Sequence, residues 1–170
     1  FSALGASTLF IPRALTAAEA PKKAKKGDVN DKINIGFIGL GQQAIHLVNG
    51  FLTIPEVRVI AGCDIYDIKR DRFVERVNKY YAEKGIKNKL DMYIKYEDLL
   101  AREDIDAVVI ATPDHWHAAI AIAACKAGKD VYLEKPLTFT VYEGQRLIEA
   151  VRANNRILQV GSMQRSMAEF

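Results

Sequence analysis

From residue 33 onward, short apolar runs alternate with longer segments whose apolar residues recur every three or four positions. The apolar runs are continuous, which is typical of strands buried on both faces of a sheet. The longer segments have the period of amphipathic helices. The pattern predicts six strands, at 33–40, 57–63, 92–94, 106–112, 131–134 and 157–161. It predicts helices at about 44–52, 67–83, 97–102, 115–127 and 141–153.

Strands that alternate with helices of this length are joined by right-handed crossovers and form a parallel sheet. We therefore expect an α/β fold of the Rossmann type at residues 33–161. Its doubly wound sheet would lie between two layers of helices, with the strand order 3-2-1-4-5-6. Ligands bind such sheets at the carboxyl ends of the strands, where the order reverses. Gly128 is placed to end the helix over 115–127 in a left-handed conformation.

The first 20 residues are apolar, rich in small side chains, and end in Ala18-Glu19-Ala20, which resembles a signal-peptidase cleavage site. We expect residues 1–20 to be the remnant of an export signal and residues 21–32 to be a flexible linker. The alternative is an ordinary amphipathic helix. Export would place a bacterial protein in the periplasm, and a leader that is not a signal would leave it in the cytoplasm. No stretch elsewhere is long and apolar enough to span a membrane.

Charge and cysteine content narrow the classes of partner. The chain has 24 Lys and Arg against 21 Asp and Glu, but residues 33–170 hold 18 of each. A neutral body does not favour nucleic acid or an anionic membrane as a partner. Cys63 and Cys125 form no CxxC pair, so we expect two buried thiols rather than a disulfide.

A glycine-rich segment follows the first predicted strand and opens a helix. It has the form G-x-G-x-x-G/A, made by Gly39, Gly41 and Ala44 with Gln42 and Gln43 between them. Gly39 would permit the tight turn, Gly41 would let a pyrophosphate approach the backbone, and Ala44 would let helix and strand pack closely. The helix N-terminus would offer free N–H groups to the phosphates. In this context the segment predicts a dinucleotide site, and the alternative is a strand–turn–helix that binds no nucleotide.

Asp64 ends the second predicted strand, 25 residues after Gly39. An acid at this point can accept hydrogen bonds from the hydroxyl groups of the adenine ribose, and it repels a 2′-phosphate. We therefore expect NAD to be preferred, with NADP as the alternative, because Lys69 and Arg70 weaken that repulsion. The other interpretation of Asp64 is a solvated loop acid.

The fourth predicted strand ends in the segment ATPDHWHA, at residues 111–118. Thr112 and Pro113 would lie against the dinucleotide at the switch point of the sheet. Asp114 is placed to cap the N-terminus of the following helix.

Two histidines in this segment raise the question of a metal site. His115 and His117 form an H-x-H pair, but residues i and i+2 do not share a face of a helix and no third ligand is evident, so we expect no metal. His117 could instead lie near the nicotinamide or pack at the helix start. We expect Trp116 to be a packed aromatic rather than a stacking surface.

The chain resembles the glucose–fructose oxidoreductase / inositol dehydrogenase / MocA family, and in particular its exported bacterial branch. The resemblance spans residues 33–165 and rests on motifs in the expected order. They are GFIGLGQQA, Asp64, YEDLL at 96–100, ATPDHWH, AGKDVYLEKPLT at 127–138 and VGSMQR at 160–165.

The resemblance implies an NAD(P)-dependent oxidoreductase that acts on a sugar, a polyol or a derivative. The Glu-Lys-Pro motif of the family falls on Glu134, Lys135 and Pro136. Lys135 inherits the role of the lysine beside the nicotinamide and the reacting hydroxyl group. Glu134 would lie near the nicotinamide ribose, and Gln164 with Arg165 would approach the substrate.

The family also has a second α/β domain that binds substrate and carries the acid/base residue. We expect that domain to be absent from this sequence, with residues 162–170 as the start of the connection to it. Homo-oligomers would form through the same domain.

Two other functions stay open. Some relatives oxidise a sugar transiently to cleave a glycosidic bond with tightly held NAD, but the resemblance implies that they lack this lysine. The third interpretation is a dinucleotide-binding module without turnover.

Overall fold

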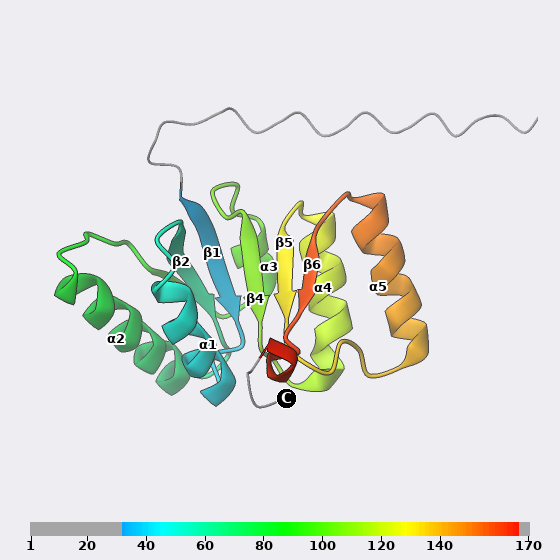
Figure 1. Cartoon of the computed structure of the whole chain (residues 1–170), viewed down its shortest axis with the longest axis horizontal. Coiled ribbons are helices and arrows are strands. Elements are labelled where there is room, and N and C mark those ends of the chain that lie inside the picture. The colour runs from blue at the N-terminus through cyan, green and yellow to red at the C-terminus, as the bar shows by residue number, and fades with distance from the viewer. Residues whose placement is uncertain (1–31, 167–170) are drawn as a thin grey trace, which may run out of the picture.

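The computed structural model describes residues 32–166, which form one six-stranded sheet covered by helices on both faces (Figure 1). The strand order is β3-β2-β1-β4-β5-β6 and every pairing is parallel, as predicted. The strands are β1 (Ile33–Ile38), β2 (Val57–Cys63), β3 (Asp91–Tyr93), β4 (Ala107–Ile110), β5 (Asp130–Leu133) and β6 (Leu158–Val160). The predicted leader and nearly all of the predicted linker lie outside the described residues.

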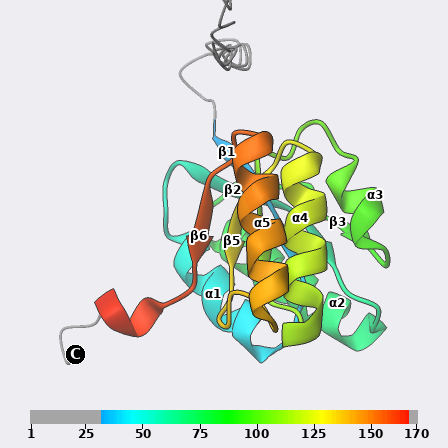
Figure 2. The ribbon, with the colours of Figure 1, turned by 90° about the vertical axis from the view of Figure 1, so that its right-hand side faces the viewer.

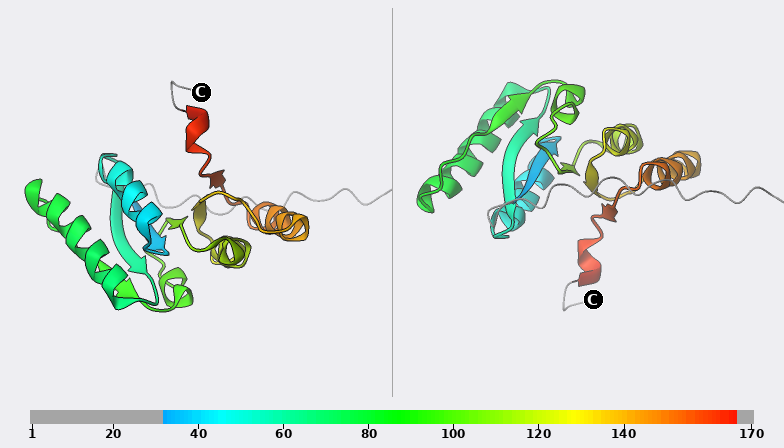
Figure 3. Two further views of the ribbon diagram at one scale, coloured as in Figure 1. Left: turned by 90° about the horizontal axis from the view of Figure 1, so that it is seen from below. Right: turned by 90° about the horizontal axis from the view of Figure 1, so that it is seen from above.

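The helices form two layers, seen along the sheet in Figure 3. One face is covered by α1 (Gln42–Leu52) and α2 (Asp67–Glu83). The other face is covered by α3 (Tyr96–Leu100), α4 (His117–Lys126) and α5 (Val141–Ala153). Two single 3-10 turns complete the fold, η1 (Asp114–Trp116) and η2 (Met163–Ser166).

The continuous apolar runs of the sequence lie in the middle of the sheet, where both faces of a strand are covered. Phe37 of β1 faces α1 and α2 and packs against Phe73 and Phe51, with ring centroids 5.2 and 5.8 Å away. The next residue, Ile38, faces the opposite layer and is equally buried. This alternation within an apolar run explains why the strand has no polar face.

Several element ends differ from the sequence-based expectation for local reasons. β1 stops at Ile38 because Gly39 has φ +83° and turns the chain away from the sheet. The single helix expected over 115–127 is divided into η1 and α4. Gly128 has φ +76° and its N–H donates to the carbonyl of Cys125, so the predicted left-handed helix end is confirmed.

Both cysteines, Cys63 and Cys125, are buried free thiols, as predicted. Within residues 32–166, no helix is long and apolar enough to cross a membrane.

Candidate functional site

The glycine loop begins with a close contact between two strand ends. The N–H of Gly39 donates to the carbonyl of Cys63 at 2.9 Å, which ties the end of β1 to the end of β2. A Cβ on Gly39 would lie 2.7 Å from the carbonyl oxygen of Ala111, at the end of β4. The positive φ and the close approach both require glycine.

The N-terminus of α1 is open toward the carboxyl ends of the strands. Gly41 is its N-cap residue, no side chain caps it, and its first turn has no acidic residue. A Cβ on Gly41 would meet no atom of residues 32–166 within 4 Å. The free N–H groups and the positive end of the helix dipole therefore face space that an anion could fill.

Asp64 is almost completely buried beside this loop. Its carboxylate accepts hydrogen bonds from the N–H of Leu40 at 2.8 Å and of Tyr66 at 3.0 Å. Lys69 lies 3.8 Å from the same carboxylate, and Arg70 donates to the Asp64 carbonyl and pairs with Asp67. A carboxylate has about four acceptor positions, so Asp64 can hold the loop and still accept from a ligand hydroxyl.

Arg72 is a residue of this site that sequence reasoning missed. From α2 its Nη2 donates to the carbonyl of Leu40 at 3.1 Å, within the glycine loop. Its Nε is buried without a hydrogen-bond partner, and among residues 32–166 no carboxylate pairs with it. The sequence shows only a charged helix here, because which of its side chains reaches back to the loop depends on how α2 packs.

His117 joins two loops at the carboxyl edge of the sheet. The ring is 1% exposed, with Nδ1 2.6 Å from the carbonyl oxygen of Pro136 and Nε2 2.9 Å from that of Thr112. Both ring nitrogens thus face the protein backbone, so His117 links the end of β4 to the loop after β5. The Thr112 hydroxyl is buried without a partner among residues 32–166, and a bound ligand could supply one.

Glu134 and Gln43 lie 91 residues apart in the chain and meet at this site. The buried Glu134 carboxylate accepts from Gln43 Nε2 at 2.8 Å and from the N–H of Lys135 at 3.1 Å. A Cβ on Gly161 would lie 2.9 Å from Glu134 Oε1, so β6 also packs against this carboxylate. The first turn of α1 and the ends of β5 and β6 are therefore held together.

The remaining predicted residues are exposed at the same edge or beyond it. Lys135 is exposed and precedes Pro136 through a cis peptide bond. Gln42 is exposed in the first turn of α1. Gln164 and Arg165 are exposed on η2, which projects from the sheet on the side of α1 (Figures 2 and 3).

Two local expectations for the segment after β4 were wrong. Asp114 does not cap α4, because it starts η1, which is inserted before the helix, and its side chain makes no capping hydrogen bond. Trp116 is 47% exposed rather than packed, because η1 lies at the rim of the fold. Among residues 32–166, no group of three or more His, Cys, Asp or Glu side chains could hold a metal ion.

The groups at the carboxyl ends of β1, β2, β4 and β5 suit a dinucleotide. An uncapped helix N-terminus and the space at Gly41 suit a pyrophosphate, and Asp64 suits a ribose. Thr112 follows β4 and Lys135 follows β5, on the side of β1 opposite to Asp64. A nicotinamide would extend to this side if the adenine ribose lay at Asp64.

Curated relatives match this chain over most of its described length. A glycosyl hydrolase family 109 protein of Shewanella baltica is 33% identical over 127 residues, which are 74% of this chain and 27% of that protein. A glycosyl hydrolase family 109 protein 1 of Shewanella sp. strain MR-4 is 34% identical over 125 residues, with 73% and 27% covered. The chain thus spans about a quarter of the length of these relatives.

Solved structures agree in fold. The apo scyllo-inositol dehydrogenase of Lactobacillus casei has a TM-score of 0.69 and 25% identity, with 81% of this chain and 39% of that chain covered. A 3-ketoreductase of Actinomadura kijaniata in complex with NADP and TDP-benzene has a TM-score of 0.68 and 28% identity, with 78% and 38% covered. A family model for oxidoreductases with an NAD-binding Rossmann fold matches residues 33–162. The chain therefore belongs to the glucose–fructose oxidoreductase / inositol dehydrogenase / MocA family of oxidoreductases.

Proposed function

We propose that the protein is an NAD(P)-dependent oxidoreductase that transfers hydride between nicotinamide and a secondary alcohol or carbonyl of a sugar, polyol or derivative. The main support is the setting of Lys135. It is exposed, it pairs with no carboxylate among residues 32–166, and it follows Glu134, which is bonded to the first turn of the glycine-loop helix. The dehydrogenase and ketoreductase names of the structural neighbours agree with this class.

Lys135 would orient the substrate oxygen and stabilise the negative charge that develops on it. The cofactor, when bound, supplies the hydride acceptor. Oxidation of the alcohol also releases the hydroxyl proton, which we assign to an acid/base residue of a second domain. Gly39, Gly41, Gln42, Gln43 and Ala44 would hold the pyrophosphate. Thr112, Pro113, His117 and Glu134 would shape the nicotinamide side, and Gln164 with Arg165 would contact substrate.

The test is NADH formation by the full-length protein on a panel of sugars and polyols. We expect Lys135→Met to lower kcat about 10²- to 10³-fold, the usual effect of removing one charge-stabilising donor, while NAD affinity from calorimetry changes little. Lys126→Met removes an exposed lysine at the end of α4 and is the matched control. Full activity of Lys135→Met would contradict the assignment.

We propose NAD as the preferred cofactor, with NADP as the alternative. Asp64 supports the preference for NAD because a buried carboxylate repels a 2′-phosphate. Lys69 and Arg70 contact Asp64 and Asp67, and their positive charges are the reason that NADP stays the alternative. Asp64→Ser should weaken NAD binding and bring the dissociation constants for NAD and NADP closer together. An unchanged ratio would refute the ribose assignment.

A second candidate is cleavage of a glycosidic bond through transient oxidation of the sugar. The glycosyl hydrolase family 109 relatives favour it. Aryl glycosides distinguish the two activities. Release of the aryl group without net formation of NADH would show a glycosidase and would rule out the simple dehydrogenase. A third candidate, a binding module without turnover, would bind NAD and fail on every substrate.

Export and self-association complete the proposal. Residues 1–20 would direct export to the periplasm, which fractionation of cells with and without them can test. Homo-oligomers would form through a second domain, and light scattering on the full-length protein measures their mass.

A further inference from the structure

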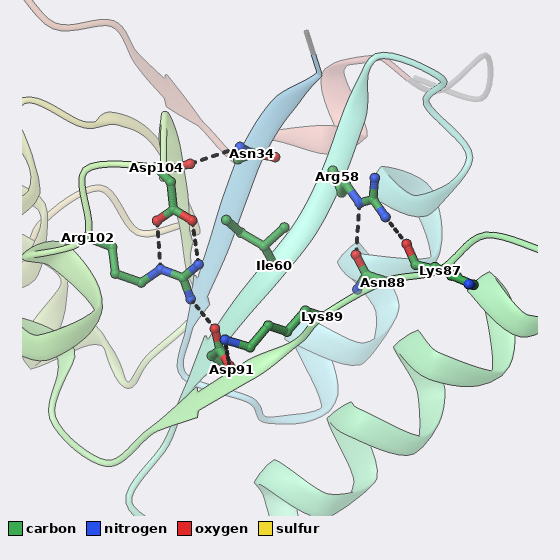
Figure 4. Close-up of a pocket in the computed structure, with 9 residues that line it drawn as sticks. All are labelled: Asn34, Arg58, Ile60, Lys87, Asn88, Lys89, Asp91, Arg102 and Asp104. Atoms are coloured by element: carbon green, nitrogen blue, oxygen red, sulfur yellow. Dashed lines mark hydrogen bonds and ion pairs between the residues drawn. The ribbon is translucent and has the colours of Figure 1, made fainter. Parts of the chain in front are cut away.

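A groove of about 560 Å³ lies at the amino ends of β1, β2 and β3, at the opposite end of these strands from the glycine loop (Figure 4). Nothing in the cofactor site uses it. It is lined by Asn34, Arg58, Ile60, Lys87, Asn88, Lys89, Asp91, Arg102 and Asp104.

Two features of the fold leave this groove open. α3 has only five residues, so this helix can cover only a short length of its face of the sheet. β2 carries a bulge, because Ile35 pairs with Val59 and Gly36 pairs with Ala61, which leaves Ile60 without a partner on β1. Bulges re-aim side chains and are enriched beside functional sites. Ile60, which is 8% exposed, contributes an apolar part of the lining between two arginines (Figure 4).

The arginine on one side of Ile60 is neutralised. Arg102 donates to both carboxylate oxygens of Asp104, at 2.8 and 2.6 Å, and to Asp91 at 2.9 Å. The hydrogen bond from Arg102 holds the pKa of Asp104 below its ordinary value. Arg102 is therefore committed to the protein and has little capacity for a ligand.

The arginine on the other side is not neutralised. Arg58 Nε donates to Asn88 Oδ1 at 3.0 Å, and Nη2 donates to the carbonyl of Lys87. Asn88 is itself fixed, because its amide donates to the carbonyl of Val59 at 3.0 Å. Among residues 32–166 no carboxylate pairs with Arg58. Neutral partners therefore orient the guanidinium without cancelling its charge, and among residues 32–166 Nη1 makes no hydrogen bond.

We propose that this groove binds a small organic oxyanion, with its carboxylate or phosphate group on Arg58 and its apolar part over Ile60. The lining has four cationic side chains and two carboxylates, so it is positive overall. A guanidinium held in place by its other N–H groups loses little entropy when it binds an oxyanion. The site is separate from the dinucleotide crevice and does not depend on the proposed reaction.

The test is a titration of the full chain in which the NMR chemical shifts of the backbone amides report binding. The probes are sodium butyrate, which has a carboxylate and an apolar stem, inorganic phosphate, and n-butanol as the uncharged control. We expect saturable shifts at Arg58, Ile60 and 87–89 with a dissociation constant of about 1 mM, and none with butanol. A response to butyrate alone identifies a carboxylate site, and a response to phosphate alone identifies a phosphate site. No saturable shift with either anion overturns the proposal.

Variants of Arg58 distinguish binding of the anion from the anchoring of the loop at 87–89. Arg58→Met should abolish the saturable shifts, and Arg58→Lys, which keeps the charge but not the planar fork, should weaken binding at least threefold. Arg76→Met is the control, because Arg76 bonds Asn49 on the opposite face of the sheet. Unchanged NAD affinity shows that a variant is folded. Equal anion binding by wild type and folded Arg58→Met or Arg58→Lys would refute the role of Arg58.

Discussion

The two ends of β1 and β2 use different chemistry. At the carboxyl ends, the uncapped N-terminus of α1 leaves backbone N–H groups beside the open space at Gly41, and the carboxylate of Asp64 is bonded to the backbone of the glycine loop. At the amino ends, Asn34 and Arg58 contribute side chains, and the backbone is already paired. One end therefore presents backbone donors and the other presents fixed charge. This difference follows from strand direction, because only the carboxyl ends meet free helix N-termini.

The largest expected effect tests the burial of Cys63, at the carboxyl end of β2. Burial raises the pKa of the Cys63 thiol from 9.0 to about 12, with the charges of Asp64 and Glu97 acting in the same direction. The reactive thiolate is then about 10³-fold rarer than in the unfolded chain at pH 8. We expect alkylation by iodoacetamide, followed by mass spectrometry, to be slower in the native protein by about that factor.

The same shift makes stability depend on pH. The unfolded thiol ionises above pH 9, while the folded thiol stays protonated until about pH 12. Its contribution to stability is therefore complete below pH 9 and falls as the pH rises toward 12. Equal alkylation rates in buffer and in urea would contradict the buried position of Cys63.

The next effect tests which glycine of the loop serves the fold and which serves the ligand. Gly39→Ala places a Cβ 2.7 Å from a backbone oxygen at positive φ, so we expect a loss of about 2–4 kcal/mol in stability and about 100-fold in NAD affinity. The Cβ of Gly41→Ala meets no atom of the described residues within 4 Å, so stability should change by less than about 0.5 kcal/mol while NAD affinity falls. Thermal unfolding and calorimetry measure the two. Equal destabilisation by both variants would remove the distinction.

A smaller effect tests whether the glycine loop also depends on a charged side chain. Arg72 bonds the Leu40 carbonyl and has no acidic partner among the described residues, so its charge would attract the pyrophosphate. We expect Arg72→Met to weaken NAD binding about tenfold, equivalent to about 1.4 kcal/mol, and to reduce its salt dependence. Arg76→Met, one turn further along α2, should leave both unchanged. A loss of affinity without a change in salt dependence would indicate only packing.

The smallest effect lies at the groove end. The Arg102 hydrogen bond lowers the pKa of Asp104 in the folded state, so this pair stabilises the fold above the ordinary pKa of an aspartate. That contribution is lost as the pH falls through the lowered pKa. Asp104→Asn should lower the free energy of unfolding by about 0.5–1 kcal/mol at pH 7. It should also make this free energy fall less steeply as the pH is lowered, and it should leave NAD affinity unchanged. A change in NAD affinity would mean that the two ends are coupled.

The fold was predictable because its signals are local. Apolar runs of the right length, the turn at Gly39 and the left-handed Gly128 each depend on a few neighbouring residues. The errors arose where two local structures compete within one segment. Asp114 is a suitable cap by sequence, yet it lies in η1, and α4 starts only at His117.

The order of strands and helices, the glycine loop and the position of Asp64 were predictable from local signals, because periodicity and short motifs encode these features. The pairing of Gln43 with Glu134 and the contacts of His117 with Thr112 and Pro136 depend on the folded arrangement. The same holds for which arginines are neutralised and for the position of Ile60 in the lining of a groove. These contacts join residues that are distant in the chain, and their geometry depends on strand register and helix length. No local pattern of residues specifies such geometry.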